Sequence, residues 1–508
     1  MSAEARTASL AGAAVAPHFA FDNSYARDLE GAYVAWQPAA PPAPKLVRLN
    51  RALATELGLD ADALQGPTGL ALLSGATVPA RAQPLAQAYA GHQFGGFSPQ
   101  LGDGRALLLG ELIDRHGRRR DIAFKGSGRT PFSRGGDGKA VLGPVLREYL
   151  IGEAMHALGI PTTRALAALA TGEVVQRETP LPGALLVRVA ASHLRVGTFQ
   201  YFAARGDEAM LRRLADHAIA RHDPALAGAD QPYLELLRAV VRRQAALIAR
   251  WMGVGFIHGV MNTDNMTISG ETIDYGPCAF IEAYDPRAVF SSIDHQGRYA
   301  YGNQPGIAQW NLTRLAEALL PLLHSDSEQA VALATEVLQG FAPCYVAEHL
   351  AVMRAKLGLD DAGDAQADQQ LAADYLDLLH AHGVDFTLGF RRLRDAAVGE
   401  DAALRALFGA ATEPLAAWLQ RWHARSTAMA MPADARQQSM ARANPAYIPR
   451  NHQVEAALAA AVNGGNLVPF ERLLAVLQHP FEERAEDVDF MQPAALELTA
   501  GYRTFCGT

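Results

Sequence analysis

The segment "HGVMNTDN", residues 258–265, is followed by "DYGP", residues 274–277, and the pair is the most informative part of the chain. It places three oxygen-bearing side chains close together in the chain: Asp264, Asn265 and Asp274. Carboxylate and amide oxygens suit Mg²⁺ in nucleotide sites, where phosphates and water complete an octahedron. Both stretches are also rich in turn-forming residues, so ordinary hairpin chemistry is the alternative interpretation. The two can be separated by searching the rest of the chain for phosphate-binding groups.

The spacing of this segment is similar to that of the catalytic and metal-binding loops of protein kinases, H-R-D-x-x-x-x-N and D-F-G. His258 and Asn265 occupy matching positions, and Asp274 begins a D-Y-G triplet. The position of the kinase base is Val260, which cannot accept a proton. Asp264 is the only carboxylate within the loop, and it is therefore the candidate for the base.

A lysine in an apolar segment provides a second element of a nucleotide site. Lys125 lies in "DIAFKGSG" (121–128), and a lysine inside an apolar strand must reach an anion or water. In kinases such a lysine binds phosphates and pairs with a helix glutamate. Glu148, in the expected helix within 143–161, is the natural partner, and Glu153 is the rival. An edge-strand lysine with an unrelated helix glutamate is the structural alternative.

Glycines and arginines add further candidate phosphate contacts. In "QFGGFSPQLGDGRALLLGE" (93–111), Gly102 and Gly104 would let the backbone approach a ligand, and Arg105 would add charge. An ordinary glycine-rich turn is the alternative. Arg188 and Arg195 flank "VAASHL" after an expected buried strand. They are either structural or a bidentate clamp for phosphates.

Composition limits the class of protein. The chain has 508 residues, 49% of them hydrophobic and 19% charged, and a net charge of −8, which gives no general case for nucleic acid. The basic run "RHGRRR" (115–120) is interpreted as a solvated hairpin turn, with a phosphate-binding patch as the alternative. Three cysteines fit a reducing compartment, and no apolar run approaches a membrane span. The N-terminus makes a poor secretory signal, so we expect a cytoplasmic protein. We also expect a monomer without membrane or nucleic-acid partners.

The order of expected elements predicts an α+β protein with a two-lobed, kinase-like fold and an enlarged, mostly helical C-terminal part. The expected divisions are an N-terminal extension (1–80), a nucleotide-binding N-lobe (81–200) and a helical C-lobe with the catalytic and metal loops and the C-terminal tail (201–508). A long amphipathic helix from Tyr233 to Met252 leads into the opening motif. The buried face expected for it consists of Leu234, Leu237, Val241, Leu247, Ile248 and Trp251.

Five segments together resemble the SelO family, known in bacteria as YdiU. They are "YAGHQFGGFSPQLGDGRA", "FKGSGRTPFSRGGDGKAVLGPVLREYL", "HGVMNTDNM", "IDYGPCAF" and "NPAYIPRNHQVEAAL". The likeness runs from about residue 21 to the end. It implies a pseudokinase that binds ATP in a flipped pose and transfers AMP to Ser, Thr or Tyr hydroxyls of proteins. UMP transfer from UTP with Mn²⁺ is also attributed to the family.

The resemblance also implies roles for individual residues. Asp264 would accept the proton, Asn265 and Asp274 would hold Mg²⁺ (or Mn²⁺), and Glu148 would orient Lys125. The nucleotide-binding set would be Gly102, Gly104, Arg105, Lys125, Asp137, Gly138, Arg188 and Arg195. Two other functions stay open: a kinase-like enzyme that moves the γ-phosphate, and an inactive nucleotide-binding scaffold. Labelled ATP distinguishes all three.

Two cysteines lie outside this set. Cys506 is the third residue from the end, where some relatives carry selenocysteine, and Cys278 follows the D-Y-G triplet. We hypothesise that the two thiols are redox-sensitive and can pair, which would restrain the segment around Cys278.

Overall fold

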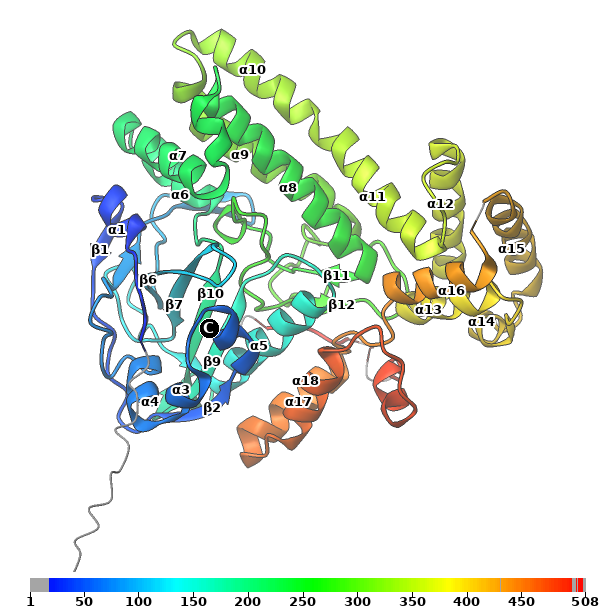
Figure 1. Ribbon diagram of the computed structural model, residues 1–508, viewed down its shortest axis with the longest axis horizontal. Helices are drawn as coiled ribbons and strands as arrows, with labels where there is room; N and C mark the ends of the chain where they lie inside the picture. The colour runs from blue at the N-terminus through cyan, green and yellow to red at the C-terminus, as the bar shows by residue number, and fades with distance from the viewer. Residues whose placement is uncertain (1–17, 430, 496–498, 500, 506–508) are drawn as a thin grey trace, which may run out of the picture.

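The computed structural model describes residues 18–429, 431–495, 499 and 501–505. Its N-terminal part is built around an antiparallel sheet, and most of the chain after residue 195 is helical (Figure 1). The protein is thus a mixed α/β protein, which confirms the coarser part of the predicted fold class. Residues 1–17, which carry the expectation about a secretory signal, lie outside the described part.

The main sheet has the strand order β1-β3-β6-β7-β10-β9-β2, and β8 pairs with β10. All of these pairings are antiparallel. Strands β1 and β2 come from the segment before residue 80, so this segment is part of the sheet. The strands are β1 (Tyr33–Ala35), β2 (Lys45–Leu49), β3 (Leu85–Gln87), β6 (Ala106–Ile113), β7 (Arg119–Lys125), β8 (Ala140–Val141), β9 (Arg164–Gln176) and β10 (Pro180–Ala190).

Alternation along β7 sorts its side chains between two cores. Ile122 and Phe124 belong to a core shared with the short helices α2 (Arg51–Glu56), α3 (Ala61–Gln65) and α4 (Pro67–Leu73). Ala123 belongs to the opposite core, which includes helix α5 (Leu142–Ala157). Because side chains alternate between the faces of a strand, Lys125 shares the face of Ala123 and points toward α5. The sheet therefore aims a lysine at a helix that carries Glu148.

The helices after residue 195 form the second part of the molecule. In the view of Figure 1, most of them extend away from the sheet-bearing part. Two small ribbons, β4 (Gly91–Gln93) with β5 (Gly96–Ser98) and β11 (Phe256–Ile257) with β12 (Ala279–Phe280), lie outside the main sheet. The helices are α6 (Val196–Ala203), α7 (Glu208–His222), α8 (Pro232–Val254), α9 (Gln304–Leu323), α10 (Ser327–Gln339), α11 (Phe341–Leu357), α12 (Ala365–Ala381), α13 (Phe386–Ala396), α14 (Ala402–Phe408), α15 (Thr412–Thr427) and α16 (Ala433–Ala443).

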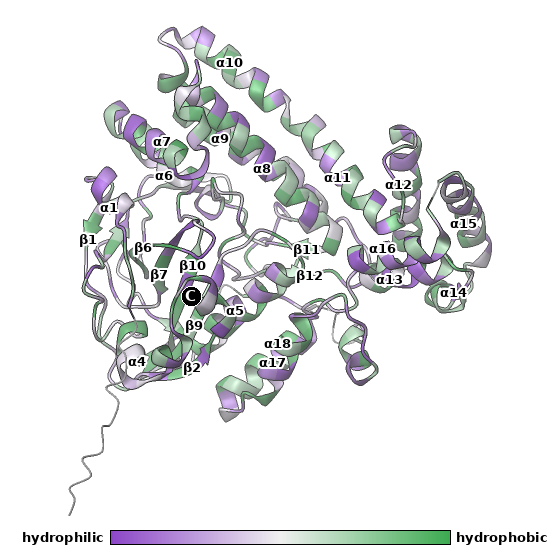
Figure 2. Cartoon of the chain, in the orientation of Figure 1, coloured by the Kyte–Doolittle hydropathy of each residue, from purple (hydrophilic) through white to green (hydrophobic). Residues whose placement is uncertain are grey.

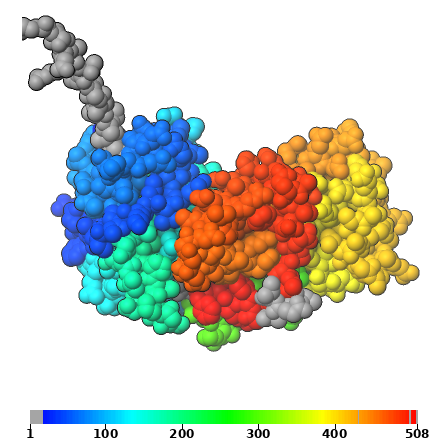
Figure 3. Space-filling model, turned by 90° about the horizontal axis from the view of Figure 1, so that it is seen from below, coloured from blue at the N-terminus to red at the C-terminus, as the bar shows by residue number. Residues whose placement is uncertain are grey.

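The last helices return to the sheet-bearing part. Helices α17 (Asn451–Gly464) and α18 (Val468–Leu477) both contact α5. The space-filling view shows this C-terminal segment between the N-terminal part and the helices around α12–α16 (Figure 3). Arg147 of α5 pairs with Glu455 of α17 at 2.9 Å. The C-terminal helices thus support the back of the helix that presents Glu148.

Two local predictions are confirmed. The long helix α8 begins one residue before the predicted helix and ends two residues after it, and all six residues of its predicted face are buried. The run 115–120 connects β6 to β7 as a hairpin. Its arginines are not simply solvated, however. Arg118 and Arg120 pair with Asp114, whose side chain is fully buried.

One helical stretch, Ser327–Leu357, spans 31 residues and includes α10 and α11. An 18-residue part of it has a mean hydropathy of 1.3, which together with the length of the stretch matches a membrane-crossing helix, and 22% of that part is buried. Apolar residues recur along its length (Figure 2). This match concerns length and composition alone, and the core helices of soluble proteins also meet it. The expectation of no membrane partner therefore stays a prediction.

Candidate active site

A cleft of about 1100 Å³ lies between the sheet and the segment 260–277. Its walls come from the β3–β6 connection, the 132–140 loop, α5, residues 260–277, α17 and residues 502–505. All twelve residues predicted to bind the nucleotide, the metal or the proton, or to support them, line this one cleft. They are Gly102, Gly104, Arg105, Lys125, Asp137, Gly138, Glu148, Arg188, Arg195, Asp264, Asn265 and Asp274.

A buried cluster of charges occupies the floor of the cleft. Lys125 Nζ lies 2.6 Å from Glu148 Oε2 and 2.6 Å from Asp274 Oδ1. Arg188 Nη2 lies 2.5 Å from Asp274 Oδ1, and its Nε donates to Glu148 Oε1 at 2.7 Å. The rival Glu153 pairs instead with Arg164 at 2.6 Å. The tertiary structure therefore selects Glu148 as the partner of Lys125.

The charges in this cluster determine its protonation states. Burial opposes ionisation of Glu148, but the positive charges of Arg188 and Lys125 outweigh it and lower the pKa of Glu148. The same balance, with Lys125 the strongest cation, holds the pKa of Asp274 well below its usual range. Both carboxylates are therefore ionised at neutral pH. The side chain of Asp274 keeps 23% of its surface exposed, which leaves it accessible from the cleft.

The backbone holds Asp274 in an unusual conformation. Its φ of 63° lies in the left-handed region, which non-glycine residues rarely adopt and which costs on the order of 1 kcal/mol or more. The next residue, Tyr275, is buried, and its hydroxyl bonds Thr162. Fixing the D-Y-G segment at Tyr275 aims the Asp274 carboxylate at Lys125. Such local strain is common where a side chain must be held for function.

Asp264 is a buried carboxylate, and only one of its two oxygens has a hydrogen-bond partner within the described residues. Its Oδ2 accepts a hydrogen bond from Gln93 Nε2 at 3.1 Å, while its buried Oδ1 has no hydrogen-bond partner within the described residues. Burial raises the pKa of Asp264 to about 6, against the opposing charge of Arg195. Arg195 Nη1 donates to the main-chain oxygen of Asp264 at 2.9 Å. A carboxylate with this pKa and an unpartnered oxygen is suited to accept a proton near neutral pH.

The donor set around Asn265 fits a hard divalent cation. Asn265 Nδ2 donates to the Val260 main-chain oxygen at 3.0 Å, so the amide oxygen is the end left for a ligand. With Asp274, this supplies two protein oxygens, as Mg²⁺ accepts when phosphates provide the others. Within the described ranges, no group of three or more His, Cys, Asp or Glu side chains could form an all-protein metal cage. The set therefore suits a cation bound together with a nucleotide.

Glycines bring two loops close to the cleft. Gly102 has a φ of 75°, and a Cβ there would lie 2.4 Å from the Phe132 ring. Gly138 has a φ of 68°, and a Cβ there would lie 2.0 Å from the Gly128 main-chain oxygen. No other residue fits either position, because both the conformation and the space exclude a side chain. At both glycines the main chain itself therefore lines the cleft, where we expect phosphates to bind.

Several cleft residues were not predicted from the sequence, among them Arg177, Tyr89 and Asp103. Arg177 pairs with Asp137 at 2.8 Å, and the centre of the Tyr89 ring lies 4.4 Å from the Arg195 guanidinium. Asp103, between the two glycines of the first loop, is buried, and burial raises its pKa. Its position inside "LGDGR" was the one available signal. The other contacts join residues too distant in sequence for a local pattern to reveal.

Of the two cysteines that we hypothesise to pair, Cys278 lies within the described residues. Cys278 is a fully buried free thiol, and burial raises its pKa to about 11, so it is a poor nucleophile in this conformation. Cys506 lies outside the described residues. The described tail reaches the same region, because Thr504 Oγ1 donates to the Pro277 main-chain oxygen at 2.6 Å. Pairing of the two thiols stays a prediction.

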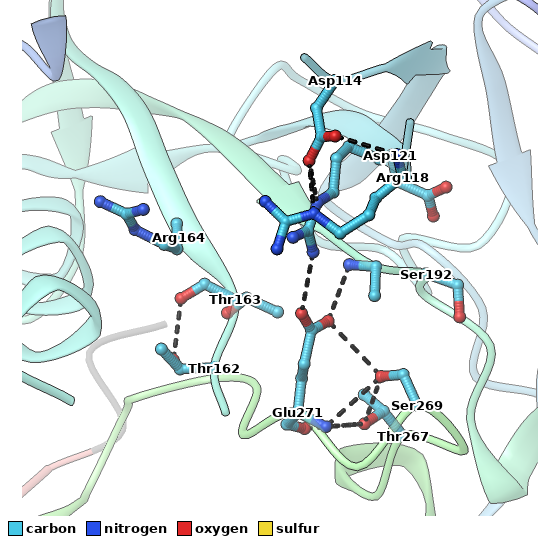
Figure 4. A network of polar contacts seen from close by, with 12 residues as sticks. Asp114, Arg118, Asp121, Thr162, Thr163, Arg164, Ser192, Thr267, Ser269 and Glu271 are labelled. Carbon is cyan, nitrogen blue, oxygen red and sulfur yellow. Dashed lines mark hydrogen bonds and ion pairs between the residues drawn. The ribbon is translucent and has the colours of Figure 1, made fainter. Parts of the chain in front are cut away.

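A second polar network joins the sheet to the segment that follows residues 258–265 (Figure 4). Glu271 Oε2 accepts a hydrogen bond from the Ala191 amide at 2.7 Å, and Oε1 lies 3.5 Å from Arg120. Arg120 in turn contacts Asp114 at 3.2 Å. Only 11% of the Glu271 side chain is exposed, and burial raises its pKa to about 7. This carboxyl group therefore connects the two parts of the molecule and titrates near neutral pH.

Changing Glu271 to glutamine is expected to stabilise the protein at pH 8 and to have little effect at pH 5. The raised pKa means that Glu271 favours folding below its ordinary value of 4.5 and loses this contribution as the pH rises through about 7. A rise of the pKa from 4.5 to about 7 corresponds to roughly 3 kcal/mol in the unfolding free energy. Urea unfolding of both proteins at pH 5 and pH 8 measures the difference, with the exposed Glu30→Gln as the control. An equal effect of Glu271→Gln at both pH values would contradict the assignment.

The charges and glycines of this cleft are suited to a nucleotide, and comparisons with known proteins place the chain among nucleotidyltransferases. A family model described as "Protein adenylyltransferase SelO" matches residues 18–478. Three relatives are named "Protein nucleotidyltransferase YdiU". One from Cereibacter sphaeroides (strain ATCC 17029) is 63% identical over 493 residues, covering 96% of this chain and 100% of its own. One from Chromobacterium violaceum is 61% identical over 473 residues (93% and 98%), and one from Methylorubrum populi is 59% identical over 497 residues (96% and 99%). The chain therefore belongs to the SelO family and is an enzyme of the nucleotidyltransferase class.

Proposed function

We propose that the enzyme transfers AMP from ATP to Ser, Thr or Tyr hydroxyls of proteins and releases pyrophosphate. UMP transfer from UTP is the variant of the same chemistry. The family description supports the adenylyl group and the protein acceptor. The observation that carries the proposal is that the Asp264 carboxylate, which has one unpartnered oxygen, lines the same cleft as the cations around Asp274.

The proposed fold is kinase-like, with the sheet and α5 as one lobe and the helices from α6 onward as the other. The Lys125–Glu148 pair and the loops carrying Asn265 and Asp274 correspond in order to those of a kinase. The kinase base position is Val260, which favours a pseudokinase that no longer moves the γ-phosphate. ATP in a pose reversed relative to kinases would bring its α-phosphate toward Asp264.

The proposed reaction is an in-line displacement at the α-phosphorus. The Asp264 carboxylate removes the proton from the acceptor hydroxyl, whose oxygen then forms a bond to the α-phosphorus. The bond from the α-phosphorus to the α,β-bridging oxygen breaks, and pyrophosphate departs with its electron pair. Lys125, Arg188 and Arg195 stabilise the negative charge that develops on the phosphates. Glu148 acts as a positioning residue for Lys125 and Arg188.

Asn265 and Asp274 would hold a divalent cation, Mg²⁺ or alternatively Mn²⁺. When bound, this ion would neutralise phosphate charge and orient the triphosphate. The cation would also offset the repulsion between Asp274 and the nucleotide. We further propose a monomeric, cytoplasmic enzyme without membrane or nucleic-acid partners, supported by the net charge of −8 and the scarcity of cysteine.

Labelled ATP tests the proposed reaction directly. Incubation with a protein acceptor should transfer label from the α-phosphate to protein and leave label from the γ-phosphate in pyrophosphate. The intact mass of the acceptor should rise by that of AMP. Transfer of γ-label would instead establish a kinase, and nucleotide binding without either transfer would establish a scaffold.

A further inference from the structure

The β4–β5 hairpin is attached to the loop that carries the proposed base. Gln93 donates to Asp264 Oδ2 at 3.1 Å, and the Phe94 amide donates to Asn262 Oδ1 at 3.2 Å. Gln93 and Phe94 both line the cleft. The hairpin therefore forms the part of the cleft wall that is closest to Asp264.

The hairpin exposes aromatic rings at considerable local cost. Phe94 has a φ of 52°, in the left-handed region that bulky residues avoid, and it is 38% exposed. Phe97 is 42% exposed. The Phe94 ring lies 5.1 Å from the Tyr299 ring, and the Tyr299 hydroxyl also accepts from the Phe94 amide. The hydrogen bonds from the Phe94 amide to Asn262 and Tyr299 thus hold an exposed ring on a strained backbone.

A second group of side chains extends this exposed surface. The His92 ring lies 4.9 Å from the Phe97 ring and 5.3 Å from the Trp310 ring, between centroids. The Arg298 guanidinium lies 4.7 Å from the centre of the Trp310 ring. Arg298 makes no ion pair within 4.0 Å with a carboxylate of the described part of the chain. Its charge is therefore left for a partner from outside.

The position of Arg298 connects it to the turn of the hairpin. Its guanidinium carbon lies 3.8 Å from where a Cβ on Gly95 would be. Gly95 follows Phe94 directly, and Phe94 lines the cleft, so the cation lies beside the turn of the hairpin next to the cleft wall. Aromatic faces bind apolar and extended backbone groups, and a guanidinium binds carboxylates bidentately.

We propose that Phe94, Phe97, Arg298 and Trp310, the acceptor surface, bind the segment of the protein substrate that carries the modified hydroxyl. The favoured acceptor has an acidic residue near that hydroxyl, which pairs with Arg298. This inference rests on the proposed function, since it concerns the acceptor of the same reaction. Continuity with Asp264 supports it, because an acceptor hydroxyl that reaches this base lies beside Gln93 and Phe94.

The test uses paired synthetic peptides that carry one Ser, Thr or Tyr flanked by either glutamates or lysines. With ATP labelled at the α-phosphate, the wild-type enzyme should prefer the glutamate peptides about tenfold in kcat/KM. Arg298→Glu should reverse this preference. Phe94→Asn should raise the KM for peptide about tenfold, and asparagine is chosen because it tolerates the left-handed conformation. Nucleotide affinity, measured separately with a fluorescent ATP analogue, should change less than twofold in both variants.

Matched controls separate the surface from general effects of charge and exposed apolar area. Arg287→Glu reverses an exposed arginine elsewhere, and Val174→Asn replaces an exposed apolar residue of β9. Both should leave the peptide preference unchanged. Transfer with the same preference in Arg298→Glu as in the wild type would overturn the acceptor surface and leave the proposed function intact. Absence of wild-type transfer to every peptide and to denatured casein would overturn the proposed function itself.

Discussion

Changing Asp274 to asparagine is expected to lower nucleotidyl transfer by about 10³-fold or more, because a cation ligand that stabilises charge is worth several kcal/mol. The asparagine keeps the shape of the side chain and removes its charge. Lys125 and Arg188 would then lose the carboxylate oxygen that both contact within 2.6 Å. The loss therefore combines weaker cation binding with misplacement of two phosphate-binding groups.

The measurement is the rate of label transfer from the α-phosphate at several concentrations of divalent cation. The cation concentration required for half-maximal rate should rise in Asp274→Asn, and saturating cation should not restore the wild-type rate. Exposed Asp361→Asn serves as the matched control and should retain wild-type transfer. Full activity of Asp274→Asn at low cation concentration would show that the cation is held elsewhere.

Changing Asp264 to asparagine is expected to lower the transfer rate by roughly 10²–10⁴-fold, the range that positioned general bases contribute. Asparagine can keep the hydrogen bond from Gln93 and the contact of the main chain with Arg195, but it cannot accept the proton. Because Asp264 makes no ion pair with Lys125 or Arg188, the charge cluster should remain in place.

This difference separates the roles of the two aspartates. Asp264→Asn should bind ATP with nearly wild-type affinity and should lose kcat rather than cation dependence. Titration with a fluorescent ATP analogue measures the affinity, and single-turnover kinetics measure the chemical step. A loss of nucleotide affinity equal to that of Asp274→Asn would assign Asp264 to binding. Retention of full kcat would remove it from the mechanism.

Much of the fold was predictable because it depends on local pattern. Helix α8 has a 3.6-residue periodicity, and the six residues predicted for its buried face are all among its fourteen buried residues. The β6–β7 hairpin was predictable because two apolar segments flank a polar turn. The contribution of β1 and β2 to the main sheet was not, because short strands acquire their partners from distant parts of the chain.

The candidate site shows the same division. Lys125, Asp264, Asn265 and Asp274 were identified from residue type and spacing, and the structure brings them into one cleft. Gln93 was missed although it touches Asp264, because 171 residues separate the two in the chain. The roles assigned to these residues remain predictions for the experiments above.

The amino-acid sequence shows which chemical groups this protein has and their order: a lysine in a strand, a helix glutamate, and two loops with Asp and Asn oxygens. Packing in three dimensions selects Glu148 rather than Glu153 as the partner of Lys125, and it lets Arg188 share Asp274 with that lysine. Sequence patterns could not select these partners, because periodicity and turn chemistry act over a few residues. The pairing of buried charges, in contrast, depends on which side chains the packed sheet and helices leave facing one another.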